Sequence, residues 1–360
     1  MKTDRELFEV YTEYLLSSNG LVTGTRLSEL VDGKISHDRI QRYLSEQVKT
    51  SADLWSVVKP QVRMYQRVDG MLIIDDSISE KPYTDENDII CWHHDHAKGR
   101  SVKGINFLTS LYRTDQISLP IGFSIIAKTE HYIDKKDGKQ KRRSTVSKND
   151  YYRKMVKQAV DNQVPFQYVL NDLWYSSAEN MKFLKHEMQK SFVMPLKSNR
   201  KVALSLEDRK KGLYRRVDEL ELKLDTTQEA YLEDVDFVLL LNKHIFKNED
   251  GSEGIQYLVT DDKTLDGPGL FNIYKKRWNI EPYHKSLKQN VSLERSPTQT
   301  VRSQTNHFFS SLCGYIKLEL MKVSTNINHF ALKSKLYLNA LKAAHETLRR
   351  LQPQQLTALL

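Results

Sequence analysis

The chain has 360 residues and a formal net charge of +9, from 55 Lys and Arg against 46 Asp and Glu. Hydrophobic residues make up 39% of the sequence, which is enough to form a core and excludes a disordered chain. No apolar run approaches the ~18 residues that cross a membrane, and two cysteines are too few for a disulfide framework. We therefore expect a cytoplasmic globular protein with an acidic partner, foremost nucleic acid.

Residues 1–66 are predicted to be helical and to form a DNA-binding domain. Apolar residues at helical spacing indicate a short helix over residues 25–31, and a turn that contains glycine follows. Ser36 can then cap a second helix, which carries Arg39 and Arg42 on its outer face. Two short helices across such a turn resemble a helix-turn-helix, so both arginines are candidate DNA contacts. A small helical domain of another kind would show the same pattern, and this alternative stays open.

A change of period after residue 67 predicts a mixed sheet with covering helices over residues 67–196. The predicted strands are residues 68–74, 102–112, 118–127, 166–170 and 191–196, and the predicted helices are residues 150–160 and 177–189. Three strands followed by alternating helices and strands are typical of an α/β fold in which parallel and antiparallel pairs share one sheet.

Much of the positive charge of the chain lies in two windows. Residues 135–157 contain ten bases and two acids, and residues 275–302 contain seven bases and two acids. Clustered bases suit contacts with DNA phosphates, so Lys141, Arg142 and Arg143 are candidate DNA contacts. The alternative is a solvated loop without a partner.

The second half of the chain reads as three further regions. Residues 197–266 form a β-rich insertion with its clearest strands at residues 235–246 and 254–260, residues 267–299 contain a long helix, and residues 300–360 are helical. The chain thus has an α/β core with a helical region at each end.

Acidic residues follow two predicted buried strands. Asp75 and Asp76 come after the strand at 68–74, and Asp172 comes after the strand at 166–170. If the strands are neighbours, the carboxylates converge and repel each other unless a cation lies between them. Mg²⁺ or Mn²⁺ is the natural occupant of such an oxygen-lined site. Adjacent strand residues point to opposite faces, so only one of Asp75 and Asp76 can be a ligand, and Asp172 could instead cap the next helix.

The helix within residues 267–299 carries a polar face. On a helical wheel, one face about 80° wide holds Tyr274, Arg277, Glu281, Lys285 and Lys288. A face without an aliphatic residue is not a core stripe, although an ordinary solvated face is an alternative. Pro282 should kink this helix, at a cost of about 3 kcal/mol, unless a new helical segment begins near position 282.

These residues resemble a known family. Tyr274, Arg277, Glu281 and Lys288 have the spacing Y-x2-R-x3-E-x6-K, which is similar to the YREK signature of DDE transposases encoded by bacterial insertion sequences. Asp75 and Asp172 look like the first two acids of the DDE triad. The resemblance covers residues 68–320 and implies an RNase H-like mixed sheet with flanking helices and a β-rich insertion.

The resemblance implies a two-metal active site. Asp75, Asp172 and Glu281 would hold two Mg²⁺ or Mn²⁺ ions, which drive an in-line displacement at a DNA phosphodiester. The preference for Asp75 over Asp76 rests on the likeness of Asp75-x-Ser77 to the family's first-acid segment. The remaining signature residues would bind DNA, namely Tyr274, Arg277, Lys285 and Lys288.

The implied function is cleavage at the ends of a mobile element and transfer of the 3′-hydroxyls into target DNA. The partners would be double-stranded DNA and a second subunit of a homodimer, and the DNA-bound protein would be associated with the nucleoid. A nuclease that never joins strands, or a transposase-derived DNA-binding protein without activity, are the alternatives.

One feature departs from relatives that form DNA hairpins. Those proteins stack a tryptophan of the insertion on a flipped base, but this chain has no tryptophan between Trp174 and Trp278. Tyr257 and Phe246 are the aromatic residues of the insertion that could replace it.

Overall fold

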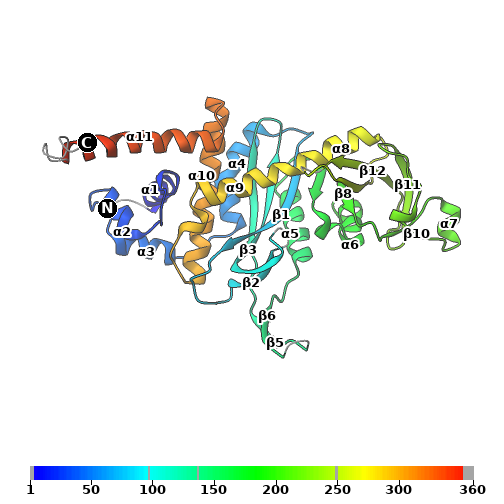
Figure 1. The fold of residues 1–360 in the computed structure, drawn as a ribbon, viewed down its shortest axis with the longest axis horizontal. Coiled ribbons are helices and arrows are strands. Elements are labelled where there is room, and N and C mark those ends of the chain that lie inside the picture. The colour runs from blue at the N-terminus through cyan, green and yellow to red at the C-terminus, as the bar shows by residue number, and fades with distance from the viewer. Residues whose placement is uncertain (1–3, 96–97, 136–137, 248–249, 352–360) are drawn as a thin grey trace. The chain divides into compact units, whose positions relative to one another are not determined.

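The computed structural model describes residues 4–95, 98–135, 138–247 and 250–351 (Figure 1). The chain divides into two compact units. We call Thr50–Tyr283 the core unit, and we call Met1–Lys49 together with His284–Leu360 the helical unit. Among the residues described, no helix is both long and apolar enough to span a membrane.

The core unit is built on one large mixed sheet. Its strands run in the order β10-β9-β11-β12-β13-β8-β7-β1-β3-β2, and β4 also pairs with β3. Their bounds are β1 Met71–Glu80, β2 Ile90–Asp95, β3 Arg100–Arg113, β4 Ser118–Ile125, β7 Tyr168–Asn171, β8 Ser191–Leu196, β9 Lys201–Ala203, β10 Arg215–Arg216, β11 Thr227–Leu232, β12 Leu239–Lys247 and β13 Glu253–Thr260. β1 is parallel to β7 and antiparallel to β3, and β7 is parallel to β8. The predicted mixed α/β fold, with an RNase H-like arrangement of strands, is therefore confirmed.

Helices cover both faces of this sheet. They are α4 Ser51–Tyr65, α5 Lys148–Asp161, α6 Ala178–Lys182 with a π-helical turn Phe183–Glu187, α7 Leu206–Lys210 and α8 Gly267–Lys275. Three 3-10 turns are η1 Leu173–Tyr175, η3 Val217–Glu219 and η4 Lys276–Asn279. α4 packs against β4, α5 against β3 and β4, and α8 against β8 and β12. Because both faces are covered, Met71, Leu72, Ile73 and Ile74 of β1 are all buried.

The structure changes three of the predicted elements. β1 continues to Glu80 instead of ending at Ile74, so Asp75 and Asp76 lie within the strand. The strands of the insertion extend the main sheet, because β13 is antiparallel to β8. The basic window contains a separate hairpin of β5 (Glu130–Ile133) and β6 (Gln140–Arg143), which extends away from the main sheet in Figure 1.

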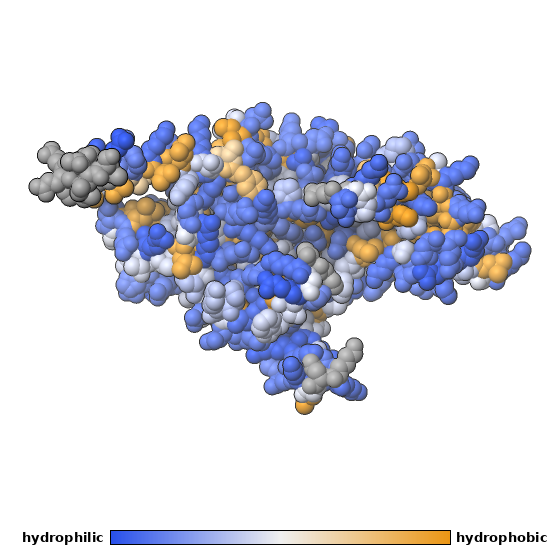
Figure 2. Space-filling view, viewed as in Figure 1, coloured by the Kyte–Doolittle hydropathy of each residue, from blue (hydrophilic) through white to orange (hydrophobic). Residues whose placement is uncertain are grey.

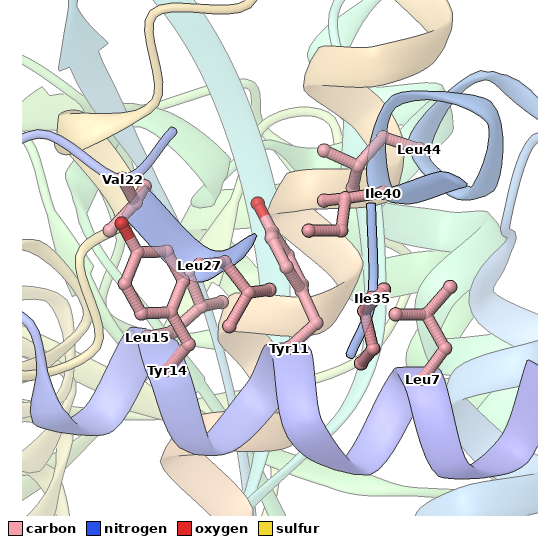
Figure 3. Close-up of a cluster of buried hydrophobic side chains, with 9 residues drawn as sticks. All are labelled: Leu7, Tyr11, Tyr14, Leu15, Val22, Leu27, Ile35, Ile40 and Leu44. Atoms are coloured by element: carbon pink, nitrogen blue, oxygen red, sulfur yellow. The ribbon is translucent and has the colours of Figure 1, made fainter. Parts of the chain in front are cut away.

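The helical unit contains both ends of the chain. Its elements are α1 Asp4–Ser17, α2 Gly24–Leu30, α3 His37–Ser45, η5 Leu293–Arg295, α10 Val301–Thr325 and α11 His329–Leu351. Figure 3 shows apolar side chains of α1, including Tyr11 and Leu15, pointing toward Leu27 of α2 and Ile40 of α3. The side chain of Ser36 accepts a hydrogen bond from the backbone of Arg39, as predicted for the cap of α3.

The helical region predicted over residues 1–66 is divided between the units, because α4 belongs to the core unit. α9 (Ile280–Asn290) begins in the core unit and ends in the helical unit. The predicted domain boundaries at residues 66, 196, 266 and 299 stay predictions.

Candidate active site

Asp75 and Asp76 point to opposite faces of the main sheet. Their neighbour β7 pairs with β1 only as far as Ile74, opposite Asn171, so Asp75 and Asp172 each follow the last residue of that pairing. Asp75 lies toward Arg277, which follows α8, whereas Asp76 is bonded to Lys148 at the start of α5. The two carboxylates therefore have different surroundings, as strand alternation requires.

Both carboxylate oxygens of Asp76 accept hydrogen bonds from residues of neighbouring elements. Its Oδ1 accepts a hydrogen bond from the hydroxyl of Tyr175 at 2.7 Å, and its Oδ2 accepts bonds from Asn106 Nδ2 at 2.8 Å and from Lys148 Nζ at 2.6 Å. These donors overcome the effect of burial and keep the pKa of Asp76 below its usual value, with Lys148 as the largest lowering cause. Asp76 is thus a carboxylate that ties β1 to β3 and α5.

Asp75 has the opposite electrostatic character. Burial, together with the negative charges of Asp172 and Asp76, raises its pKa to about 8, and Arg277 opposes this rise. Burial also raises the pKa of Asp172, whose Oδ1 accepts a hydrogen bond from the backbone of Trp174 at 3.0 Å. Asp172 therefore caps η1 and lies close enough to the other acids to repel them.

Arg277 lies between two of the predicted acids. Its Nη1 is 4.0 Å from Asp75 Oδ2, and its Nη2 is 3.5 Å from Glu281 Oε1. The side chain is 15% exposed, and in the described part of the chain its buried Nε has no hydrogen-bond partner. A buried guanidinium with an unsatisfied nitrogen is costly unless it compensates negative charge. Here it links Asp75 to Glu281.

The segment that carries these residues consists of three helical pieces. α8 ends at Lys275, η4 covers Lys276–Asn279, and α9 begins at Ile280. Pro282 is therefore in the first turn of α9, where its backbone nitrogen would have no helical acceptor in any case. A segment does restart near Pro282, which removes the expected cost of the proline.

Glu281 is not gathered with the other two acids. Its side chain is 61% exposed and contacts Arg277. Within the ranges that the structure describes, no cluster of three or more His, Cys, Asp or Glu side chains is close enough to hold a metal ion. The structure thus brings Asp75 and Asp172 together and connects Glu281 to them through Arg277.

Tyr274 is buried beneath the predicted polar face, and its contact with DNA stays a prediction. It is 3% exposed, and its hydroxyl donates to the carbonyl of Asn171 at 3.4 Å. The guanidinium carbon of Arg277 is 5.6 Å from the centroid of its ring. Burial raises the pKa of Tyr274 to about 12. Tyr274 thus packs under Arg277 and beside the residue that precedes Asp172.

The other two cations of the predicted face belong to the helical unit. The ammonium of Lys285 lies 5.4 Å from the centroid of the Phe330 ring, and Lys288 Nζ lies 3.6 Å from Glu294 Oε1. Lys285 is exposed, and Lys288 is partly buried.

The bases of hairpin β5–β6 form ion pairs with nearby acids. Lys141 pairs with Asp134, Arg143 Nε lies 2.7 Å from Glu130, and Arg142 Nη1 lies 3.6 Å from Asp88. Figure 2 shows a largely hydrophilic surface over this hairpin.

The two arginines of α3 lie beside a small open pocket of the helical unit. Arg39, Arg42 and Tyr43 line it together with the acids Asp4 and Glu46. Arg42 is exposed and Arg39 is partly buried.

Lys148 and Trp174 lie near the acids but are not among the predicted site residues. In the sequence Lys148 is one base of a charged window, whereas in the structure it is the cation that pairs with Asp76. Trp174 is 56% exposed two residues after Asp172. A large aromatic residue two positions after an acid at the end of a strand is the sequence signal that could have identified Trp174.

Two protein families match this chain. A family described as DDE superfamily endonuclease matches residues 1–216, more than half of the chain. A second family, described as transposase DDE domain, matches residues 141–316. These matches span Asp75, Asp172 and Glu281. A search of curated proteins gave no match. The mixed sheet, the paired acids and the two family matches together show that the chain belongs to the DDE superfamily of endonucleases, among the DDE transposases.

Proposed function

We propose that this DDE transposase cleaves DNA at the ends of its element and joins the 3′-hydroxyls to target DNA, as a member of the YREK group of insertion-sequence enzymes. The observation that carries the proposal is the pair of carboxylates, Asp75 and Asp172, at the end of the pairing between β1 and β7, with Arg277 linking Asp75 to Glu281. DNA is the partner that the family implies.

The donors fit a hard divalent cation. Asp75 and Asp172 offer carboxylate oxygens, and their raised pKa values show that Arg277 offsets only part of the effect of burial and mutual repulsion. We propose that Asp75, Asp172 and Glu281 hold two Mg²⁺ or Mn²⁺ ions. When bound, these ions would supply activation of a water or a 3′-hydroxyl and stabilisation of the leaving oxygen.

The chain's own residues have distinct parts in this proposal. Asp76 and Lys148 fix β1 relative to α5, so that the backbone of Asp75 is held in place. Arg277, which lies over the ring of Tyr274, neutralises part of the charge of Asp75 and Glu281, and in this proposal it would also bind a phosphate of the cleaved strand. Tyr274 is here a positioning residue.

We propose the remaining DNA contacts because the residues concerned carry a positive charge. Lys285 and Lys288 follow Glu281 on α9 and can bind phosphates as point charges. The bases of the hairpin are Lys141, Arg142 and Arg143, and those of α3 are Arg39 and Arg42. Phosphate contact by the hairpin would replace its ion pairs with Asp134 and Glu130, so its contribution should depend strongly on salt.

We expect Glu281→Ala to lower metal-dependent cleavage about 10³-fold and to change the free energy of unfolding by at most about 1 kcal/mol. The Glu281 carboxylate is 61% exposed, so solvent screens its ion pair with Arg277 even though the arginine is largely buried. Cleavage of a duplex carrying the inverted repeats that flank the coding sequence measures the first effect, and thermal unfolding measures the second. Glu233→Ala, at an exposed position of the insertion, is the matched control. Cleavage by Glu281→Ala at the wild-type rate would remove Glu281 from the site.

Two further outcomes separate the alternatives. A nuclease without strand transfer would cleave these ends but would not join pre-cut ends to a target plasmid. A DNA-binding protein without activity would bind the ends and show no Mg²⁺-dependent turnover.

We also propose that the DNA complex contains a homodimer joined by α11. Tyr337, Leu341, Ala344, Leu348 and Leu351 repeat at intervals of four and three residues, as in a coiled coil. All of α11 from Ser334 onward is exposed in the single chain, including Leu348 at 56% and Leu351 at 75%. A stripe of this kind can be buried by the same helix of a second copy.

Replacing two residues of this stripe should dissociate the dimer. We expect Leu341→Ser combined with Leu348→Ser to give a particle of one chain mass in light scattering, where the wild type gives two. Asn339→Ser with Glu346→Ser, on the opposite side of α11, should leave the mass unchanged. A wild-type protein that stays monomeric with and without DNA would contradict the proposal.

A further inference from the structure

An open cavity lies between α5 and the helix formed by α6 and its π-helical turn. Its volume is about 550 Å³, within the ~300–1,000 Å³ that ligand-binding pockets usually have. All of the lining residues belong to the core unit. The charged side chains around the cavity are the bases Arg153, Lys154, Lys157 and Lys182 and the acids Glu179 and Glu187. The lining therefore carries an excess of positive charge.

The cavity lies on the side of the sheet away from Asp75. Lys148, the first residue of α5, is 2.6 Å from Asp76, whereas Asp75 points to the opposite face, toward Arg277. A phosphate held in the cavity therefore cannot be the phosphate at which Asp75 would act.

The wall of the cavity is held by hydrogen bonds between α5 and α6. Arg153 Nη1 donates to Asn180 Oδ1 at 3.0 Å and lies 3.1 Å from Glu179 Oε1. Asn180 Nδ2 donates in turn to Asn149 Oδ1 at 2.9 Å. The side chain of Arg153 is 18% exposed, and it also pairs with Asp150. Arg153 thus holds the two helices together, and its charge is already compensated.

Two lysines of the cavity have no such compensation. Within the residues that the structure describes, the ammonium groups of Lys154 and Lys182 form neither a hydrogen bond nor an ion pair, and both side chains are exposed. Lys157, one turn after Lys154, pairs with Asp161 at 3.0 Å, but these side chains are 60% and 58% exposed, so the pair is weak. Cations that gather at one cavity raise the local positive potential and attract an anion.

The helix on the other side of the cavity contains an unusual turn. α6 continues as the π-helical turn Phe183–Glu187, in which the backbone of Met188 donates to the carbonyl of Phe183, five residues earlier, at 3.1 Å. His186 and Glu187 of this turn line the cavity. Turns of this kind are rare and are frequent at functional sites. The turn is thus a second observation, independent of charge, that distinguishes this cavity.

We propose that the cavity binds phosphates of a second DNA duplex, other than the one that is cleaved, with Lys154 and Lys182 as its main contacts. Lysines bind phosphates as point charges, which suits contact with a DNA backbone of any sequence. The second duplex would be positioned on the side of the sheet to which Asp76 points. This inference rests on the proposed function, because DNA is the partner that the family implies.

The test compares the full wild-type chain with Lys154→Gln combined with Lys182→Gln. Each protein is first saturated with an element-end duplex in Ca²⁺ instead of Mg²⁺, and a fluorescent duplex of unrelated sequence is then titrated into the complex at several salt concentrations. The double variant should bind this second duplex more weakly, and the slope of log K against log[salt] should become shallower by about 2, since two phosphate contacts are lost.

Two control variants accompany this experiment. Lys59→Gln with Lys210→Gln removes the same charge at two exposed positions of the core unit outside the cavity, and it should leave the slope unchanged. Lys154→Arg with Lys182→Arg keeps the charge and should restore the wild-type slope. Thermal unfolding of the double glutamine variant should match the wild type, because both lysines are exposed.

The outcomes distinguish this inference from the proposed function. Equal slopes for the wild type and the double glutamine variant would overturn the inference, as would a wild-type complex that binds inorganic phosphate at these lysines but no second duplex. Mg²⁺-dependent cleavage of the element end should be unchanged in the double glutamine variant. Failure of the wild type to cleave in Mg²⁺ would contradict the proposed function by that separate measurement.

Discussion

Asp75→Asn is expected to lower Mg²⁺-dependent cleavage by about 10³-fold or more and to stabilise the metal-free protein at pH 8. The two effects have one origin. Asp75 is a buried carboxyl group beside Asp172 and Asp76, and its pKa is raised to about 8. Asparagine has a similar shape but no charge, so it removes both the metal ligand and the repulsion.

The same pKa sets the pH dependence of stability. Between about pH 4 and pH 8, the folded metal-free chain keeps the proton of Asp75, whereas the unfolded chain has lost it. The stabilising contribution of this group is therefore fully present below about pH 4 and is lost as the pH rises toward 8. The slope is at most about 1.4 kcal/mol per pH unit. Bound metal replaces the proton, so apparent metal affinity should rise with pH over the same range.

Urea unfolding in EDTA between pH 5 and pH 8 measures this prediction. Asp75→Asn should lose stability less steeply with rising pH than the wild type. Asp85→Asn, at an exposed position, controls for the loss of one negative charge. Equal slopes for the wild type and Asp75→Asn would show that Asp75 is not the strained carboxyl group.

Asp75→Asn is expected to stabilise the metal-free protein, whereas Asp76→Ala should destabilise it by about 2–4 kcal/mol. Its carboxylate accepts hydrogen bonds from Tyr175, Asn106 and Lys148. Alanine leaves these donors without their acceptor, and the side chain of Lys148 is only 31% exposed. A loss of this size is a large part of the 5–15 kcal/mol that stabilises a typical domain.

The free energy of unfolding in urea at pH 7 checks this prediction, with Asp85→Ala as the matched control. Asp76→Asn should fall between the wild type and Asp76→Ala, since an amide oxygen can still accept from Tyr175 or Lys148. If Asp76→Ala is as stable as the wild type and is inactive in cleavage, the roles of Asp75 and Asp76 are exchanged.

Local patterns predicted much of the core. Mostly apolar segments predicted the strands Ser191–Leu196 and Glu253–Thr260 closely, and Ser36 caps its helix as predicted. These features depend on neighbours in the chain, which a sequence displays directly.

Features that depend on residues distant in the sequence were harder to predict from the sequence alone. The polar face that included Tyr274 assumed one continuous α-helix, but η4 interrupts it. A 3-10 turn advances about 120° per residue instead of 100°, so residues on either side of η4 are rotated relative to their places on the predicted wheel. Tyr274, which precedes η4, is buried.

The same limit applies to the acids and the basic window. The sequence of β1 does not show which of Asp75 and Asp76 points to which face of the sheet. The two are distinguished by their contacts with Arg277 and Lys148, which are distant in sequence. The hairpin in the basic window was not predicted, because no local pattern shows that β6 pairs with β5 or that its bases pair with Glu130 and Asp134.

The most direct measurement of the central claim is cleavage of an element-end duplex by the wild type and by Asp172→Asn, each with Mg²⁺ and with EDTA. Asparagine can still accept the hydrogen bond from the backbone of Trp174, so the turn after β7 should be retained. The account predicts cleavage by the wild type with Mg²⁺ alone, and a rate about 10³-fold lower for Asp172→Asn. Cleavage by Asp172→Asn at the wild-type rate, or wild-type cleavage that persists in EDTA, would contradict it.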